Sequence, residues 1–410
     1  MNKKISLGVA IAIVLLAVAL TVSATMVLAM RQFSSLVSDV GQRQAMYDYI
    51  DEIDSAARKD YTIDEEKLRA ALANGYINGL EDPYAKYLSA VEYQKVQAQL
   101  AGNRTGFGLT VTARETELLV LSVDENSPAA LSGIKKGDVI TAVDGEAVTA
   151  ASYAAVQAKI GQAEKLIVTV KQGTTPTAVE LSANTYTVVS TSGRLIGESV
   201  GYIRISEFNN LTALQFKNVY NELTQQGATY FLFDVRNNAG GQIDAVKEIL
   251  DYLLPTGPYV NFEKKDGVTK FSATDTYEMT APSVTLVNGN TVGEAELFAA
   301  VLQDFGKTRL VGTSTQGKAV VQEYVTIQSD KGAVQLSIGQ LSRIHKGDSW
   351  KDAGLLPDQT ADLEYNKQLY FNLLTDEEDT QLQAALSLLR SNTYLPLVNA
   401  TNQATTTTAP

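Results

Sequence analysis

The stretch from Val200 to Leu254 reads VGYIRISEFNNLTALQFKNVYNELTQQGATYFLFDVRNNAGGQIDAVKEILDYLL. Its two apolar runs, VGYIRISEF and YFLFDV, alternate with two segments in which apolar residues recur every three or four positions. Short apolar runs are typical of buried strands, and the recurring spacing is typical of helices. The alternation of strand and helix predicts an α/β domain on a mainly parallel sheet, which we place at residues 186–397.

Two turns of this domain follow apolar runs. The turn DVRNNAGG, from Asp234 to Gly241, ends the second strand of the quoted stretch. The turn NGNTVG, from Asn288 to Gly293, lies between a later apolar run and an amphipathic helix. Functional groups in such domains lie at the carboxyl ends of the strands, so these turns are the expected place of the functional site.

The N-terminus carries the clearest local signal. Two lysines, at positions 3 and 4, precede an uncharged apolar run over residues 5–30. Since about 20 apolar residues span the hydrocarbon core, we expect a single-pass membrane anchor at residues 1–30, with its N-terminus in the cytoplasm because of the lysines. A cleaved signal peptide, with small residues from Val22 to Ala24, is the alternative. In both cases the remainder of the chain is exported.

The segments on either side of the folded domains differ from them in composition. Residues 31–103 have helical spacing, interrupted at DPYAKYL, Asp82 to Leu88, and predict a small helical lead-in domain. Residues 398–410 contain few apolar side chains and predict a disordered tail.

Composition excludes several classes of function. The chain has a net charge of -12, no cysteine and one histidine, His345. Neutralising phosphates takes clustered Lys and Arg, so the charge argues against a nucleic-acid partner. The lack of cysteine excludes thiolate metal sites and a cysteine nucleophile, and one histidine excludes a multi-histidine site. We expect no cofactor and no metal.

Residues 104–148 change to short apolar strands separated by Gly, Asn and Asp turns. The loop GFGL resembles the carboxylate-binding loop of a PDZ domain, and SPAALSGIKKGDVITAVDG is similar to that family's helix, turn and closing strand. The peptide-binding loop would consist of Gly106, Phe107, Gly108 and Leu109. The resemblance implies a β-barrel-like PDZ domain at residues 104–185 that binds the terminal carboxylate of a peptide through backbone N–H groups. A Gly-rich hairpin without a ligand is the alternative.

The order of the segments resembles the C-terminal processing, or tail-specific, serine peptidase family. The motifs DPY, GYIRI, FDVRNNAGG, VNGNT, VGTSTQGKAVVQ and GLLPD, with the PDZ-like segment after the first, occur in the family's sequence over roughly residues 45–390. The resemblance implies a mixed α/β multidomain protein. In this family a serine is the nucleophile, a lysine is its general base and a glutamine four residues later supports the lysine. The lysine can accept a proton only when burial lowers its pKa.

The family's motif is carried over residue by residue. Lys318 in TSTQGKAVVQ matches the base, and Gln322 matches its partner. Gly240 and Gly241 match the turn whose N–H groups form the oxyanion hole, a contribution of ~3 kcal/mol per donor. The resemblance therefore implies that a base and an oxyanion turn are both present.

The nucleophile turn departs from the family's pattern. Alignment of its asparagine, threonine and glutamate puts Gly293 at the nucleophile and Glu294 after it. Gly293 has no side chain, and a carboxylate at Glu294 opposes the negative charge that develops in the oxyanion hole. We hypothesise an ion pair between Glu294 and Lys318. Thr291 and Ser314 are neighbouring hydroxyls, but a misplacement of ~1 Å already costs ~100-fold in rate.

Two functions are compatible with these residues. In the first, a membrane-anchored extracytoplasmic pseudoprotease binds C-terminal or unfolded segments of exported proteins through its PDZ domain. In the second, an active serine-type endopeptidase uses an unusual nucleophile with Lys318 as base. Gly293 favours the first. A homo-oligomer is compatible with either.

Overall fold

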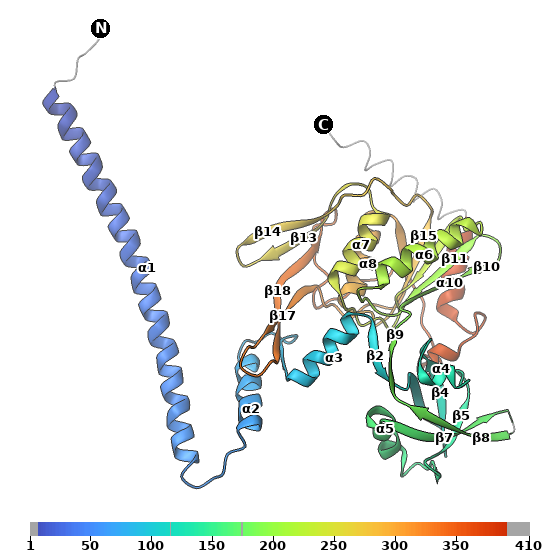
Figure 1. Cartoon of the computed structure of the whole chain (residues 1–410). Helices are drawn as coiled ribbons and strands as arrows, with labels where there is room; N and C mark the ends of the chain where they lie inside the picture. Colours follow the sequence, from blue (N-terminus) through green and yellow to red (C-terminus); the bar gives the residue numbers. More distant parts are fainter. Residues whose placement is uncertain (1–6, 115, 174, 392–410) are drawn as a thin grey trace. The chain divides into compact units, whose positions relative to one another are not determined.

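The computed structural model describes residues 7–114, 116–173 and 175–391. The chain divides into two compact units, residues 1–73 and 74–410 (Figure 1). The first six residues of the predicted anchor and the whole predicted disordered tail lie outside the described residues.

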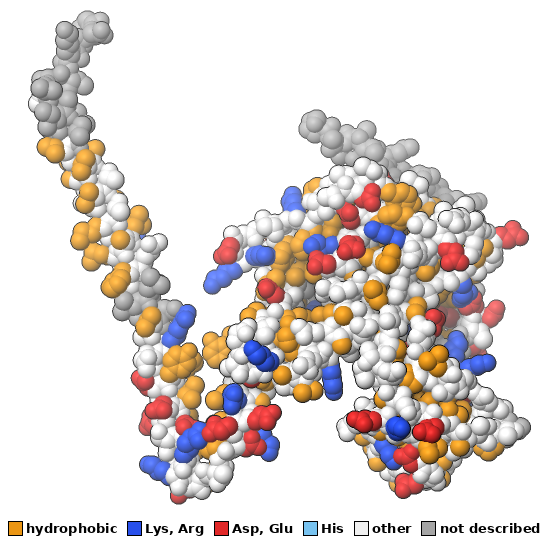
Figure 2. Space-filling view, in the orientation of Figure 1, with side chains coloured by type: hydrophobic (Ala, Val, Ile, Leu, Met, Phe, Trp, Pro, Cys, Tyr) orange, Lys and Arg blue, Asp and Glu red, His pale blue; other side chains and the backbone are white. Residues whose placement is uncertain are grey.

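The first unit is dominated by α1 (Leu7–Ala57), a helix of 51 residues. Its window Leu15–Phe33 is long and apolar enough to cross a membrane, and none of that window is buried. Figure 2 shows apolar side chains on the surface of this helix. A signal sequence near the N-terminus can have the same length and composition. The window is therefore a candidate for either a membrane span or a signal sequence. No proline occurs before Pro83, and the helix continues past the predicted boundary at residue 30. It is followed by α2 (Glu65–Asn78).

The predicted PDZ segment forms an antiparallel sheet in the order β3-β4-β5-β7-β8, with β6 paired to β5. The strands are β3 (Leu109–Arg114), β4 (Glu117–Val123), β5 (Val139–Val143), β6 (Glu146–Ala147), β7 (Lys165–Gln172) and β8 (Thr175–Ser182). Helices α4 (Pro128–Leu131) and α5 (Tyr153–Gln162) complete the domain. Alternate strand residues point to one face, and Leu118, Val120, Ile140 and Val168 are fully buried there. This domain therefore has its own hydrophobic core.

The larger domain contains a six-stranded sheet in the order β10-β11-β12-β15-β16-β19. Its strands are β10 (Thr191–Ile196), β11 (Val200–Ile205), β12 (Tyr230–Asp234), β15 (Ser283–Val287), β16 (Thr308–Gly312) and β19 (Gln359–Thr360). All neighbours pair in parallel except β10 with β11. Helices α6 (Thr212–Gln225), α7 (Ile243–Leu253) and α8 (Glu294–Asp304) share one core, while α10 (Thr380–Arg390) packs in another with residues of β12, β15 and β16.

A second sheet of the same domain is antiparallel throughout. It has the order β1-β18-β13-β14, with β17 also paired to β18. Its strands are β1 (Lys86–Leu88), β13 (Gly257–Lys264), β14 (Gly267–Ala273), β17 (Val320–Thr326) and β18 (Ala333–Arg343). The prediction of a mainly parallel sheet is therefore wrong for the core as a whole. Short turns join β13 to β14 and β17 to β18, and such turns permit only antiparallel pairing.

The connection between the PDZ segment and the larger domain is a two-stranded ribbon, β2 (Asn103–Gly106) with β9 (Asn184–Thr187). It follows α3 (Ala90–Leu100), which Ser89 and Glu92 cap reciprocally. Near the C-terminal end lie α9 (Tyr365–Leu369) and the short helix η1 (Phe371–Leu373). The predicted domain boundaries remain predictions.

Candidate active site

The two predicted turns meet at the carboxyl ends of two adjacent strands of the six-stranded sheet. Strands β12 and β15 are parallel neighbours, so the turns that follow them lie side by side. The N–H of Asn237 donates to the side-chain oxygen of Asn288 at 3.0 Å, and the N–H of Val292 donates to the carbonyl of Asn238 at 3.0 Å. The structure thus brings together the two segments that the sequence placed at the functional site.

The glycine pair of the first turn adopts conformations that L side chains rarely take. Gly240 has φ +91° and Gly241 has φ +142°. A Cβ on Gly241 would lie 2.0 Å from the carbonyl oxygen of Phe208, in a backbone bridge between the two segments. No larger residue fits there. The tight approach fixes the direction of the Gly241 N–H, which points toward the second turn.

Gly293 immediately precedes α8 and faces the predicted base. It has φ +60° and ψ -114°, and a Cβ on it would lie 3.7 Å from Cδ of Lys318. That distance is an ordinary van der Waals contact, so a small side chain has room. The side chain of a nucleophile at position 293 would therefore point at the lysine, although its backbone conformation would be strained.

The Glu294 carboxylate occupies the oxyanion turn. Its Oε2 accepts the N–H of Gly241 at 2.9 Å. Burial raises the pKa of Glu294, and the Gly241 N–H and the charge of Lys318 act against this shift. A donor that would bind an oxyanion is thus already bound to a carboxylate of the same chain.

Lys318 precedes β17 and is half-buried. Burial lowers the pKa of Lys318, whereas the charge of Glu294 raises it. The ammonium lies 5.5 Å from the centre of the Tyr84 ring. Among the described residues, no carboxylate lies within 4.0 Å of Lys318 Nζ, so the hypothesised direct ion pair with Glu294 is not formed. The side chains of Glu294 and Lys318 interact electrostatically without a direct contact.

Gln322 does not contact the lysine that it was expected to support. Its Nε2 donates to the carbonyl of Tyr84 at 2.8 Å, and its Oε1 accepts Nε2 of Gln335 at 2.8 Å. The pairing of β17 with β18 shifts by a bulge between Val321 and Gln322, which redirects the side chain. The predicted Lys-Gln contact is therefore wrong in this conformation.

Glu296 is the residue at this site whose role the sequence did not reveal. Its side chain is fully buried and its carboxylate accepts four hydrogen bonds. The donors are the N–H groups of Gly293, Gly317 and Lys318 and the hydroxyl of Thr315, at 2.9, 2.7, 2.8 and 2.5 Å. One carboxylate thus fixes the nucleophile position relative to the base. Only the glutamate three residues after the helix N-cap, a common capping pattern, hinted at this.

Two tyrosines also belong to the site and were not predicted. Tyr84, in the DPY motif, lies against Lys318 and binds Gln322 through its carbonyl. Tyr324 lies on β17, and burial, with the charge of Glu294 as a smaller cause, raises its pKa. The motif was recognised as a break in a helical pattern, but its approach to Lys318 depends on the pairing of β1 with β18.

The two hydroxyl groups near Gly293 and Lys318 are both hydrogen-bonded to backbone groups. Thr291 is fully buried, and its hydroxyl donates to the carbonyl of Val235 at 3.0 Å and accepts the N–H of Asn288 at 3.0 Å. Ser314 lies against the loop at Ala353, with its hydroxyl 3.5 Å from that carbonyl. Both hydroxyls are engaged away from Lys318.

In the predicted carboxylate-binding loop of the PDZ segment, the backbone at Gly108 approaches a neighbouring segment closely. A Cβ on Gly108, which has φ +74°, would lie 2.1 Å from Cβ of Ser127. Phe107 is buried in the PDZ core, so it offers only backbone to a ligand. Leu109 is half-buried at the start of β3, and Gly106 ends the connecting strand β2. The edge position of β3 leaves it open for pairing with a peptide strand.

Comparisons with known proteins agree with this arrangement. Residues 199–361 match peptidase family S41, and residues 119–171 match a PDZ domain. The chain is 29% identical to the carboxyl-terminal-processing protease of Picosynechococcus sp. over 76% of each chain. It is 26% identical to the carboxy-terminal processing protease CtpA of Bacillus subtilis over 88% of this chain and 81% of the relative.

A solved structure shows the same fold. An S41 protease structure from Bacteroides fragilis superimposes with a TM-score of 0.59 at 17% identity, covering 77% of this chain and 89% of the other. The two matched segments lead to one conclusion at the level of domains. Residues 199–361 of this chain are a peptidase family S41 domain, and residues 119–171 are part of a PDZ domain.

Proposed function

We propose that this protein is a pseudoprotease of the C-terminal processing peptidases: it binds the C-terminal ends of exported proteins and does not cleave them. The support comes from the relatives, which are named for C-terminal processing, and from the PDZ domain, whose fold binds chain ends in general. Loss of cleavage is supported by two residues of the nucleophile turn.

The observation that carries the proposal is the pair of substitutions at the start of α8. Gly293 points no side chain at Lys318, and the adjacent Glu294 carboxylate binds the Gly241 N–H. An acyl-enzyme cannot form without a nucleophile, and the occupied N–H cannot stabilise an oxyanion. Removing one oxyanion donor alone costs about 3 kcal/mol in known enzymes, or more than a hundredfold in rate.

The binding function is supported by the apolar residues of β3 and α5. Leu109 and Val111 of β3 and Val156 and Ile160 of α5 are half-buried apolar residues that pack on the PDZ core. An extended peptide that pairs with β3 would lay an apolar last side chain on this surface, with its carboxylate at the loop before Leu109.

The candidate span within α1 supports a location at a membrane. An uncleaved anchor would hold the domains outside the cytoplasm, where exported proteins present their ends. This placement is part of the proposal, together with the possibility of a homo-oligomer.

The test is cleavage of an unstructured protein with an apolar C-terminus by the full-length protein in detergent. We expect no cleavage by the natural chain and cleavage by Gly293→Ser combined with Glu294→Ala, since the geometry leaves room for the new side chain. The double variant with Lys318→Ala added is the control and should show no cleavage. Cleavage by the natural chain that disappears in Lys318→Ala would show instead an active peptidase with a relocated nucleophile.

A further inference from the structure

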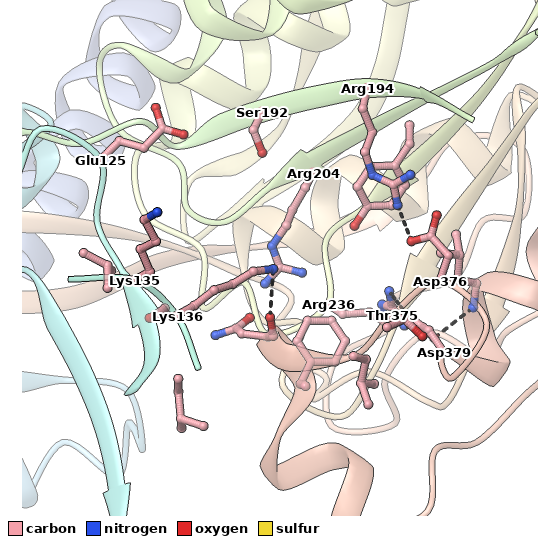
Figure 3. A pocket seen from close by; sticks show the side chains of 18 of the residues that line it. Glu125, Lys135, Lys136, Ser192, Arg194, Arg204, Arg236, Thr375, Asp376 and Asp379 are labelled. Atoms are coloured by element: carbon pink, nitrogen blue, oxygen red, sulfur yellow. Dashed lines mark hydrogen bonds and ion pairs between the residues drawn. The ribbon is translucent and has the colours of Figure 1, made fainter. Parts of the chain in front are cut away.

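A cavity of about 880 Å³ lies between the PDZ domain and the larger domain (Figure 3). One wall consists of β4, α4 and residues 133–136 of the PDZ domain, and the other consists of parts of β10, β11, η1 and residues 374–382. No described residue that lines it belongs to β3 or α5, or is Gly293, Glu294 or Lys318. The cavity is thus separate from both the apolar residues of β3 and α5 and the candidate active site.

The lining is rich in cations, although the whole chain has a net charge of -12. Five basic and three acidic side chains of the described residues line it. They are Lys135, Lys136, Arg194, Arg204 and Arg236, with Glu125, Asp376 and Asp379. Arg236 is bound to Asp234 and Asp379, and Arg194 is bound to Asp376. The charges of Arg194 and Arg236 are thus balanced by carboxylates, and those of Lys135, Lys136 and Arg204 remain to be considered.

Arg204 holds its guanidinium toward the cavity with hydrogen-bond capacity unused. Its side chain is only 24% exposed, and its nearest carboxylate oxygen, Asp234 Oδ2, lies 3.5 Å away. That oxygen already accepts bonds from Tyr202 and Arg236, both at 2.7 Å. Within the described part of the chain, the Arg204 guanidinium has no hydrogen-bond acceptor, and the Phe371 ring, 4.9 Å away, supports it. A half-buried arginine with unused donors attracts an anion.

Lys136 reaches the same space from the PDZ wall. Figure 3 shows Lys136 and Arg204 extending into the cavity from opposite sides. Its ammonium contacts the carbonyl of Asn372 at 3.4 Å. Neither Lys135 nor Lys136 has a carboxylate within 4.0 Å in the described ranges. Two like charges that face each other favour an anion between them.

Apolar side chains in the lining come from both domains. Leu121, Val123 and Ile134 contribute from the PDZ wall, and Phe371, Leu374 and Leu382 contribute from the other. A ligand that matches this surface carries one anionic group and an apolar body. The charge excess is small once Asp234 is counted beside Arg204, which favours a monoanionic carboxylate over a dianionic phosphate.

We propose that this cavity is a second site for a peptide C-terminus, with the α-carboxylate between Arg204 and Lys136 and the last apolar side chain against Phe371. The proposal goes beyond the proposed function, which places the captured end against the apolar residues of β3 and α5. A peptide end in the cavity contacts both domains at once.

The test uses the full-length protein in detergent and a short fluorescent peptide that ends in leucine. The peptide is measured with a free carboxylate and as its amide, by fluorescence anisotropy. Val156→Glu puts a charge among the apolar residues of β3 and α5, should weaken peptide binding there, and serves as the background. We expect the free acid to bind this background about tenfold or more tightly than the amide, and Arg204→Met with Lys136→Met to remove the difference.

Lys165→Met with Lys171→Met, two exposed lysines of β7, is the matched control and should change nothing. Lys135→Met with Lys136→Met, both exposed, repeats the test should Arg204→Met fail to fold. The proposal would be overturned if the free acid still bound more tightly than the amide in both pairs of cavity variants. It would also be overturned if the two peptides bound equally in the Val156→Glu background. If inorganic phosphate displaced the fluorescent peptide as well as the unlabelled free acid does, the cavity would be a general anion site, and the proposal would again be overturned. The cleavage assay is independent of all these outcomes.

Discussion

The backbone N–H of Gly293 donates to the buried carboxylate of Glu296 at 2.9 Å, and the same carboxyl group receives the N–H of Lys318. The same carboxylate therefore holds residue 293 next to Lys318, although Gly293 has no side chain. Glu296 belongs to α8, while Lys318 lies beyond β16. A structural carboxylate of this kind stabilises the turn irrespective of catalysis.

Glu296→Gln should destabilise the protein by about 3 kcal/mol, because an amide offers one acceptor oxygen to a site with four donors and adds two donors of its own. Chemical denaturation measures the change. Glu323→Gln, at an exposed position on β17, is the control and should have an effect within about 0.5 kcal/mol. Equal stability of the two variants would contradict the role assigned to Glu296.

Gly241→Ala should destabilise by about 3 kcal/mol or more relative to Gly257→Ala. Both glycines have similar φ angles, +142° and +137°, so the strain that a side chain suffers from φ is similar at the two positions. Only at Gly241 would the Cβ meet a carbonyl, at 2.0 Å, whereas nothing lies within 4 Å at Gly257. Thermal unfolding of the two variants separates steric conflict from strain. Similar losses in both would show that the contact with Phe208 relaxes.

Glu294→Ala should lower the pKa of Lys318 further. The charge of Glu294 raises the pKa of this lysine against the dominant effect of burial, so removing the carboxylate leaves burial less opposed. The lysine side chain can be followed by NMR over a pH titration of the natural protein and the variant. An unchanged midpoint in a variant of unchanged stability would show that the two groups are not coupled.

Asp234 should make stability depend on acid pH. Burial alone would raise its pKa, but Arg236 and its hydrogen bonds lower it from 3.8 to about 2. The stabilisation is therefore complete above pH ~4 and is lost as the pH falls through ~2, a contribution of about 2 kcal/mol. Denaturation curves of the natural protein and Asp234→Asn should differ by a constant amount above pH ~4 and converge below it. A difference that is the same at all pH values would contradict a lowered pKa.

Much of the fold follows from local patterns. The strand and helix rhythm of residues 200–254 appears as β11, α6, β12 and α7, since apolar runs and helical spacing act within a few residues. The second, antiparallel sheet was missed because β1 and β18 are paired across about 245 residues of sequence, and no local pattern encodes that distance. Gln322 was misplaced for a similar reason, since a bulge against β18 decides its direction.

The sequence by itself determined which residue types are present: a glycine at position 293, a lysine at position 318, a glycine pair at positions 240 and 241, and an apolar N-terminal helix. These are properties of residue types, and they are readable in order along the chain. Only the tertiary structure decided what the charged groups do. Glu294 binds the oxyanion turn instead of Lys318, and Arg204 and Lys136 face one cavity, because such contacts depend on the packing of segments that are distant in sequence.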